Sequence, residues 1–325
     1  MTAALKIISP GPHTTIQGVR RVGYQDIGIP ASGPLDPVSL RLGNALVGNL
    51  PDTPGLELLL QGPMCEVVAE SVRIALVGCS ASIEMRSHPA RRVPAGQSVW
   101  LTQGDVFRIG PLVDSACAYI AVEGGLAIAP VLGSLSTYVR GAIGGLEGRR
   151  LQKGDSVPLA SATVDARDEL ALAEPFDPGF DQPVRVVLGP QDDYFTDRGL
   201  DTFLSALYTV SPQADRMGFR LDGPTIEHAN DYNIVSDGVV SGSIQVPGTG
   251  LPIVLMVDNQ TTGGYPKIAT VVSADLPVVG RRRPGRTMRF VAVDVLEAER
   301  LRRRQEAVIE EQISRLRNVV CDNAA

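Results

Sequence analysis

The sequence is poor in the residues that most often build metal centres and disulfide frameworks. Its 325 residues include four cysteines, far apart and without a CxxC pair, and only three histidines. This usage argues against a zinc site and against a disulfide-stapled fold, and it is typical of a reducing compartment. We therefore expect a cytoplasmic protein that holds no metal.

The sequence also lacks an excess of positive charge and long apolar runs. The net charge is -6 and the pI about 5.2, so a general nucleic-acid or anionic-membrane surface is not expected. No apolar run approaches the roughly 18 residues that span a bilayer, and the N-terminus does not follow the pattern of a signal peptide. With 44% hydrophobic and 20% charged residues, the composition is that of a soluble globular protein.

Several common catalytic signatures are missing. The sequence contains no HExxH, no GxSxG, no Gly-rich phosphate loop ending in Lys-Ser/Thr and no biotinyl-lysine motif. His88 stands in Ser-His-Pro-Ala, which predicts an ordinary surface turn. Chemistry must therefore come from Gln, Arg, Asp, Thr and Lys side chains and from backbone amides at glycine turns.

The residues that are present predict a mainly β protein. Short apolar runs bounded by many of the 34 glycines and 24 prolines favour barrels or sandwiches of short strands. Helical patterns are few. Asp36 as a cap, Pro37 in the first turn and an apolar stripe predict a helix over 36–47. Two further helices are expected over 197–207 and, with a charged surface that includes Arg302 to Arg304, over 296–316.

The two halves of the chain resemble each other. The run at 5–12 resembles the run at 184–191, and each half closes with a similar turn and strand, at 104–109 and 285–290. Two copies of one β unit would explain this, with the polar segment 165–182 as the linker. We expect an N-terminal barrel with a Gly-rich insertion over 1–180, a second barrel over 181–293 and a C-terminal helix and tail over 294–325.

The stretch 242–285 carries the most informative pattern. An apolar run at 253–257 predicts a buried strand, which leads through the polar residues 258–262 into Gly263-Gly264 and a second strand at 268–272. Polar groups held on a loop between two buried strands often carry function. The alternative is a hairpin whose Asp and Thr side chains only satisfy turn amides. Local sequence does not separate these interpretations.

Other candidate groups are scattered along the chain. Arg20 or Arg21 could clamp a carboxylate, and Ser32 with Gly33 could donate to an anion. The alternative is that the arginines are surface charges and that Ser32 is a capping group. Arg216 adjoins Asp215, a pairing that is usually structural.

Taken together, these phrases resemble one family. The matching phrases include Thr14-Thr15-Ile16-Gln17, Pro30 to Asp36, Gly141 to Arg149, Asp215-Arg216-Met217-Gly218, Ile244-Gln245-Val246-Pro247 and Gln260-Thr261-Thr262-Gly263-Gly264-Tyr265-Pro266-Lys267. In order and over nearly the whole chain, they are similar to the biotin-dependent carboxyltransferase subdomain A/B family, also called allophanate hydrolase subunit 2. The family includes the C component of 5-oxoprolinase and half of the carboxyltransferase domain of urea carboxylase.

The resemblance implies a cyclophilin-like β-barrel fold, two barrels per chain, and pairing with a B component of similar fold. For 5-oxoprolinase it implies an assembly with the A and B components that opens the lactam of 5-oxoproline to glutamate with ATP, this chain alone being inactive. The alternatives are a carboxyltransferase that moves a carboxyl group from carboxybiotin to urea or a related amide, and a regulatory module that binds a protein like the B component.

The resemblance also implies a site for a small amide. Both reactions build negative charge, which suits a pocket rich in Gln, Thr, Arg and backbone amides. The expected catalytic residues are Asp258, as proton acceptor or orienter, Gln260 and Lys267. The expected substrate-binding residues are Gln17, Arg20, Ser32, Arg216, Gln245, Thr261, Thr262, Gly263 and Gly264.

The sequence departs from the family pattern at three places. Gln17 is followed by Gly18-Val19-Arg20-Arg21 instead of an Asp and a Gly-Arg pair. Asn259 stands where the family usually has Arg, and Arg281 where it usually has Gln. These changes bear on the substrate more than on the fold.

Overall fold

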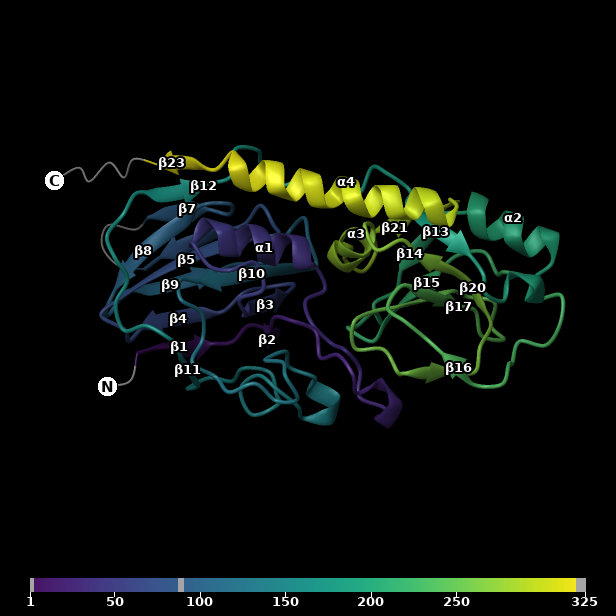
Figure 1. Cartoon of the computed structure of the whole chain (residues 1–325), viewed down its shortest axis with the longest axis horizontal. Coiled ribbons are helices and arrows are strands. Elements are labelled where there is room, and N and C mark those ends of the chain that lie inside the picture. The colour runs from purple at the N-terminus through teal and green to yellow at the C-terminus, as the bar shows by residue number, and fades with distance from the viewer. Residues whose placement is uncertain (1–2, 87–90, 320–325) are drawn as a thin grey trace. The chain divides into compact units, whose positions relative to one another are not determined.

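The chain folds mainly into β-strands, with a few helices and a long C-terminal helix, as predicted (Figure 1). The structure is a computed structural model that describes residues 3–86 and 91–319. His88 and Cys321 lie outside the described residues. Within those ranges no helix is both long and apolar enough to cross a membrane.

The described residues form two compact units, and neither is a single continuous segment. The first unit takes its residues from Met1–Arg21, Asp36–Pro178 and Val308–Ala325, and the second from Val22–Leu35 and Gly179–Ala307. The domain boundaries expected at 180 and 293 stay a prediction.

The described residues of the first unit form two large antiparallel sheets, a small two-stranded pair and helix α1. Its six-stranded sheet has the order β11-β1-β4-β9-β6-β7, and its five-stranded sheet the order β2-β3-β10-β5-β8. Apolar side chains from both sheets, among them Leu5, Ile74 and Phe107, form its core. The elements are β1 (Ala4–Ser9), β2 (His13–Gln17), α1 (Pro37–Leu46), β3 (Gly55–Leu59), β4 (Met64–Val67), β5 (Ser71–Val77), β6 (Ser82–Met85), β7 (Arg92–Pro94), β8 (Ser98–Thr102), β9 (Val106–Ile109), β10 (Cys117–Val122), η2 (Val139–Gly141), β11 (Ser156–Pro158) and a small pair of β12 (Glu169–Ala171) with β23 (Arg317–Val319).

The second unit contains one eight-stranded sheet and one two-stranded ribbon. The sheet order is β21-β14-β15-β18-β17-β20-β13-β22, and β16 pairs with β19. The elements are η1 (Gln25–Ile27), β13 (Val184–Leu188), η3 (Asp192–Tyr194), α2 (Asp197–Ser205), β14 (Tyr208–Val210), β15 (Gly218–Asp222), β16 (Asp237–Gly238), β17 (Ser243–Gln245), β18 (Ile253–Leu255), β19 (Thr262–Gly263), β20 (Lys267–Val271), α3 (Leu276–Arg281), β21 (Thr287–Met288) and β22 (Phe290–Ala292). Helix α4 (Val295–Ser314) includes residues of both units.

The large sheet of the second unit is nearly closed. Its two outermost strands, β21 and β22, are separated in sequence by Arg289 alone. Because consecutive Cα atoms are about 3.8 Å apart, the two ends of the strand order must meet. The sheet therefore curls into a barrel, which leaves little free edge.

Three of the four α-helices in the described residues fall where the sequence predicts them. The expected helices over 36–47, 197–207 and 296–316 correspond to α1, α2 and α4. Asp36 caps α1, since its carboxylate accepts a hydrogen bond of 3.0 Å from the Ser39 amide. Helix α3 was not expected, because its six residues include a proline and a glycine.

The hairpin interpretation of the 253–272 stretch is wrong. The two apolar runs form β18 and β20, as expected, but β17 lies between them in the sheet and pairs with both. The intervening polar segment is therefore a longer excursion, part of which forms β19 and pairs with β16. Its side chains are free to make contacts other than those of a tight turn.

Candidate functional site

An ion pair lies at the start of this polar segment. Arg216 donates from Nε to Asp258 Oδ2 at 2.8 Å and from Nη2 to Asp258 Oδ1 at 3.2 Å. Both side chains are nearly fully buried, at 5% and 7% exposure. A forked pair of this kind fixes both groups in direction. Arg216 thus pairs with Asp258, while its neighbour Asp215 accepts from the Met217 amide at 2.8 Å.

The segment around Ser32 is fastened to this ion pair. Arg216 Nη2 also donates to the Gly33 carbonyl at 2.8 Å, and the Ser32 amide donates to the Val257 carbonyl at 3.0 Å. Ser32 adopts a φ of 53°, which is uncommon for a residue other than glycine. Its hydroxyl is fully buried and has no hydrogen-bond partner among the described residues. Ser32, Arg216 and Asp258 are therefore brought together, as expected for one site.

A second cluster joins the two predicted glutamines. Gln260 Nε2 donates to Gln245 Oε1 at 3.3 Å, and Gln245 Nε2 donates to the Tyr265 carbonyl at 3.1 Å. A Cβ atom on Gly263 would stand 2.3 Å from Gln245 Nε2, so only glycine fits there while Gln245 keeps its position. Gly264 meets no such close contact. The first glycine of the pair is thus explained by the approach of Gln245.

Lys267 lies beside Gln245, because the register of β17 and β20 pairs these two residues. Its side chain is 4% exposed. The ammonium group donates to the carboxylate of Asp237 and, at 2.9 Å, to the Gly238 carbonyl. The hydrogen bond from Lys267 lowers the pKa of Asp237 below its usual value. The positive charge of Lys267 is therefore balanced by a carboxylate of the protein's own chain.

Gln17 and Arg20 belong to the first unit, whereas the other ten predicted residues belong to the second. Gln17 is fully buried and donates from Nε2 to the Thr15 hydroxyl at 3.1 Å and to the Thr137 carbonyl at 3.0 Å. Its Oε1 has no hydrogen-bond partner in the described part of the chain. Arg20 is exposed. Their roles toward a substrate stay a prediction.

The remaining predicted residues, and two residues that depart from the family pattern, differ in their exposure. Thr261 is half-buried and Thr262 is exposed. Asn259 is buried; its Nδ2 donates to the Gln260 carbonyl at 2.7 Å, so it shapes the loop from within. Arg281 is also buried, at the end of α3.

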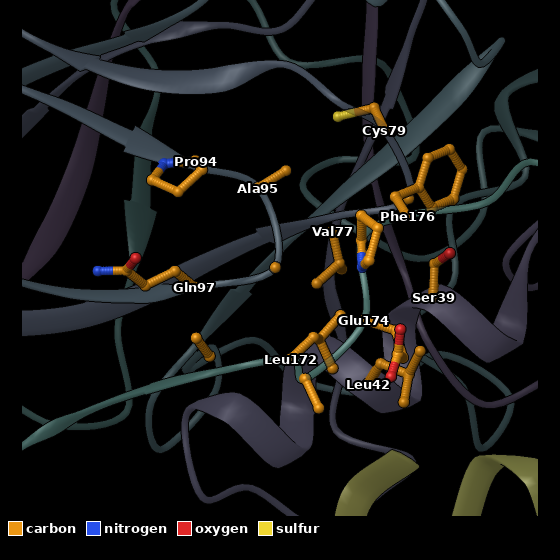
Figure 2. A pocket seen from close by; sticks show the side chains of 15 residues that line it. Ser39, Leu42, Val77, Cys79, Pro94, Ala95, Gln97, Leu172, Glu174 and Phe176 are labelled. Carbon is orange, nitrogen blue, oxygen red and sulfur yellow. The ribbon is translucent and has the colours of Figure 1, made fainter. Parts of the chain in front are cut away.

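A separate pocket of about 170 Å³ lies in the first unit and contains none of the predicted site residues. Figure 2 shows its lining, with Ser39 and Leu42 from α1, Cys79 from the turn after β5, and Leu172 and Phe176 from the segment after β12. The Ser39 hydroxyl already donates to Asp36, and burial raises the pKa of the Cys79 thiol to about 12. This pocket offers little reactive chemistry, so the candidate site remains the polar segment of the second unit.

Comparison with known proteins identifies the family of this chain. Residues 27–292 match the family model described as carboxyltransferase domain, subdomain A and B. The chain belongs to this family. The matched residues include every predicted site residue except Gln17 and Arg20.

Two bacterial relatives are similar over nearly their full length. The C component of 5-oxoprolinase from Escherichia coli is 34% identical over 97% of this chain and 99% of its own. That of Haemophilus influenzae is 34% identical over 96% of this chain and 98% of its own.

Larger proteins contain a similar region. The urea amidolyase of Saccharomyces cerevisiae is 32% identical over 94% of this chain, which spans 17% of that protein. Among solved structures, the K. lactis urea amidolyase matches with a TM-score of 0.85 and 28% identity, over 95% of this chain and 20% of that one. The chain thus spans about a fifth of these larger relatives.

Sequence reasoning missed three contributors to the site: Asp237, Gly238 and Gln191. Asp237 precedes Lys267 by 30 residues and Gln191 precedes it by 76. Asp237-Gly238 reads as an ordinary turn signal. No local pattern indicates that this turn supplies the counter-ion of a buried lysine.

Proposed function

We propose that this chain is the C component of an ATP-dependent 5-oxoprolinase, which opens a small cyclic amide to give glutamate. The observation that carries the proposal is the 34% identity to two proteins named as this component, over 96–97% of this chain. The polar cluster of the second unit supports it with groups suited to an amide substrate.

Each group has a role that follows from its contacts. Gln245 and Gln260 carry both donors and acceptors and are suited to the two edges of an amide. Lys267 supplies positive charge beside Gln245. Both carboxylate oxygens of Asp258 already accept from Arg216, so Asp258 acts as an orienting group rather than as a proton acceptor. Opening a lactam builds negative charge on the amide oxygen, which donors fixed in place stabilise.

No nucleotide-binding motif is recognised in the sequence of this chain. The sequence has no Gly-rich loop ending in Lys-Ser/Thr. Within residues 3–86 and 91–319, no three His, Cys, Asp or Glu side chains gather in a group that could hold a metal ion. We propose that ATP acts in the assembled complex. The same holds for biotin under the alternative function.

The proposal requires partners. A protein like the B component would complete the substrate site, an A component would carry further chemistry, and this chain alone would be inactive. We place the complex in the cytoplasm, in keeping with the low cysteine content.

The test is reconstitution. The chain is co-expressed with the A and B components of its own organism, and glutamate release from 5-oxoproline is measured with and without ATP. We expect ATP-dependent release from the three-protein mixture and none when this chain is left out. Release that is equal without this chain would refute the proposal.

A second candidate function is carboxyl transfer in a biotin-dependent urea or amide carboxylase. It is favoured by the 32% identity to urea amidolyase over 94% of this chain and by the TM-score of 0.85. ATP-dependent carboxylation of urea with a biotinylated partner, together with no activity on 5-oxoproline, would establish this function instead.

A further inference from the structure

Lys267 is a buried cation with an exposed counter-ion. Its side chain is 4% exposed, whereas that of Asp237 is 54% exposed. Burying an ammonium group is costly unless an anion pairs with it. The anion that satisfies Lys267 therefore stands at the surface, where another anion could take its place.

The Asp237 carboxylate is held by donors from three segments. Lys267 Nζ and, at 3.5 Å, Gln191 Nε2 both donate to Oδ2, and the Gly238 amide donates to Oδ1 at 2.8 Å. One cation with two neutral donors is a favourable setting for a carboxylate. We call these three donors the Lys267 niche. An ammonium group has three N–H donors, and two of those of Lys267 have partners among the described residues.

The segment that supplies Asp237 is fastened on both sides by backbone hydrogen bonds, from the Ile234 amide to the Gly264 carbonyl at 2.9 Å and from the Val239 amide to the Thr261 carbonyl at 3.2 Å. It pairs as β16, two residues long, with β19, also two residues long. A two-stranded ribbon of this size has little stability of its own. Val235, two residues before Asp237, is 93% exposed. The Asp237 side chain is 54% exposed and can turn into solvent without breaking these backbone bonds, whereas withdrawing Lys267 would disturb β20 in the barrel.

The niche adjoins the amide-binding glutamines. The sheet register pairs Lys267 with Gln245, and Gln245 contacts Gln260. Residues directly opposite each other on neighbouring strands have Cβ atoms about 5 Å apart. A small molecule that carries a carboxylate next to an amide could therefore reach both groups at once.

We propose that the Lys267 niche is a carboxylate-binding subsite in which Asp237 is a built-in placeholder that the carboxylate of the substrate displaces. This inference rests on the proposed function, because 5-oxoproline carries a carboxylate beside its lactam amide and urea carries none. It assigns the carboxylate to Lys267 and the lactam amide to Gln245 and Gln260.

The experiment is an anion rescue on the full chain. Asp237→Ala leaves Lys267 without its counter-ion, and thermal unfolding is followed in sodium acetate and in sodium chloride of equal ionic strength. Acetate at about ten times its dissociation constant should raise the midpoint of Asp237→Ala by about 3–6 °C over chloride, and that of the wild type by much less. L-5-oxoproline should act like acetate, and the neutral lactam 2-pyrrolidinone should not.

Two control variants isolate the niche. Asp237→Ala/Lys267→Met should lose the acetate response, because the cation is gone. Asp231→Ala removes a nearby exposed carboxylate that accepts from the Asn233 amide, and it should respond like the wild type. Asp237→Asn, which keeps the size of the side chain, repeats the comparison if Asp237→Ala does not fold.

The inference is overturned if acetate raises the unfolding midpoint of Asp237→Ala and of Asp237→Asn no more than it raises that of the wild type. It is also overturned if the midpoint of Asp237→Ala/Lys267→Met rises as much as that of Asp237→Ala. This readout needs no catalysis, so it separates the two proposals. If acetate stabilises the variant but the reconstituted complex has no 5-oxoprolinase activity, anion binding by the niche is supported and the proposed function is refuted. Activity without an acetate response refutes the niche alone.

Discussion

Arg216 and Asp258 show how a residue proposed for the site can also have a structural role. Each is nearly inaccessible, and Arg216 additionally fastens the Gly33 carbonyl. Removing one member of a buried ion pair leaves an unpaired charge, whereas replacing both by apolar side chains is often neutral. This asymmetry allows the two roles to be measured separately.

We expect Asp258→Ala to lower the free energy of unfolding by about 3–5 kcal/mol, because the buried Arg216 guanidinium loses its ion-pair partner. The double variant Arg216→Met/Asp258→Leu should recover most of that loss. In the reconstituted complex the double variant should still release glutamate about 100-fold more slowly, the scale on which a preorganised polar group acts. Urea denaturation and the glutamate assay measure the two effects.

The matched control is Asp275→Ala in the same unit. Asp275 also pairs with an arginine, but the Arg185 side chain is 35% exposed and can be hydrated. Asp275→Ala should therefore cost less stability than Asp258→Ala and leave the glutamate assay unchanged. A double Arg216/Asp258 variant with full activity would show that the ion pair serves the fold only.

At the scale of an element, α1 depends on a buried cap. The Asp36 carboxylate accepts from the Ser39 amide and hydroxyl, and the Asp36 amide donates to the Tyr119 hydroxyl at 2.8 Å. That hydroxyl donates in turn to Glu57 at 2.7 Å. The start of the helix is thus tied to two strands of the first unit, β3 and β10.

Asp36→Ala should lower the free energy of unfolding by about 1–2 kcal/mol, the upper part of the usual range for a helix cap. Asp36→Asn keeps an acceptor for the Ser39 amide and should lose clearly less. Urea denaturation followed by circular dichroism gives both values. Equal losses for the two variants would mean that the charge of Asp36, and not its capping bond, stabilises α1.

The positions of the helices and strands along the chain were easier to predict than which strands lie next to each other in the sheet. Asp36, Pro37 and the apolar periodicity mark α1 because capping and amphipathic spacing are local properties. The strands at 253–257 and 268–272 are equally local. That β17 lies between them is not, because strand order depends on residues distant in sequence. The hairpin interpretation failed for this reason.

The candidate site likewise combines residues that local patterns predict with partners that they do not. The polar string from Gln260 to Lys267 is visible in the sequence, and so is Asp258. Their partners Arg216, Asp237 and Gln191 come from turns distant in sequence, and the strand order of the folded sheet brings them close. Arg216 was included only through the family resemblance, and Asp237 and Gln191 were not found at all.

At the scale of the whole molecule, two carboxylates link stability to acid pH, one in each unit. The hydrogen bond from Arg149 lowers the pKa of Asp155, and the hydrogen bond from Lys267 lowers the pKa of Asp237. In both cases the folded-state pKa lies below the unfolded value of about 3.9. The unfolded chain then binds more protons, so this stabilisation is complete above the unfolded pKa and is lost as pH falls through the folded pKa.

We expect the contribution of Asp155 and Asp237 to the urea unfolding midpoint to be constant above about pH 5 and to decline below about pH 4. Asp155→Asn/Asp237→Asn should lower the midpoint at neutral pH and make the acid decline shallower. Urea unfolding from about pH 3 to about pH 7 measures this change. An acid decline as steep in the double variant as in the wild type would assign the effect to other carboxylates.

The threading of the chain limits how this protein can be divided. Residues 22–35 belong to the second unit, although they lie between two segments of the first. A recombinant fragment that starts at residue 179 would lack Gly33 and Ser32, and with them the carbonyl that Arg216 binds and the amide that donates to the Val257 carbonyl. A single crossover at residue 179 would therefore separate residues 22–35 from the rest of the unit to which they belong.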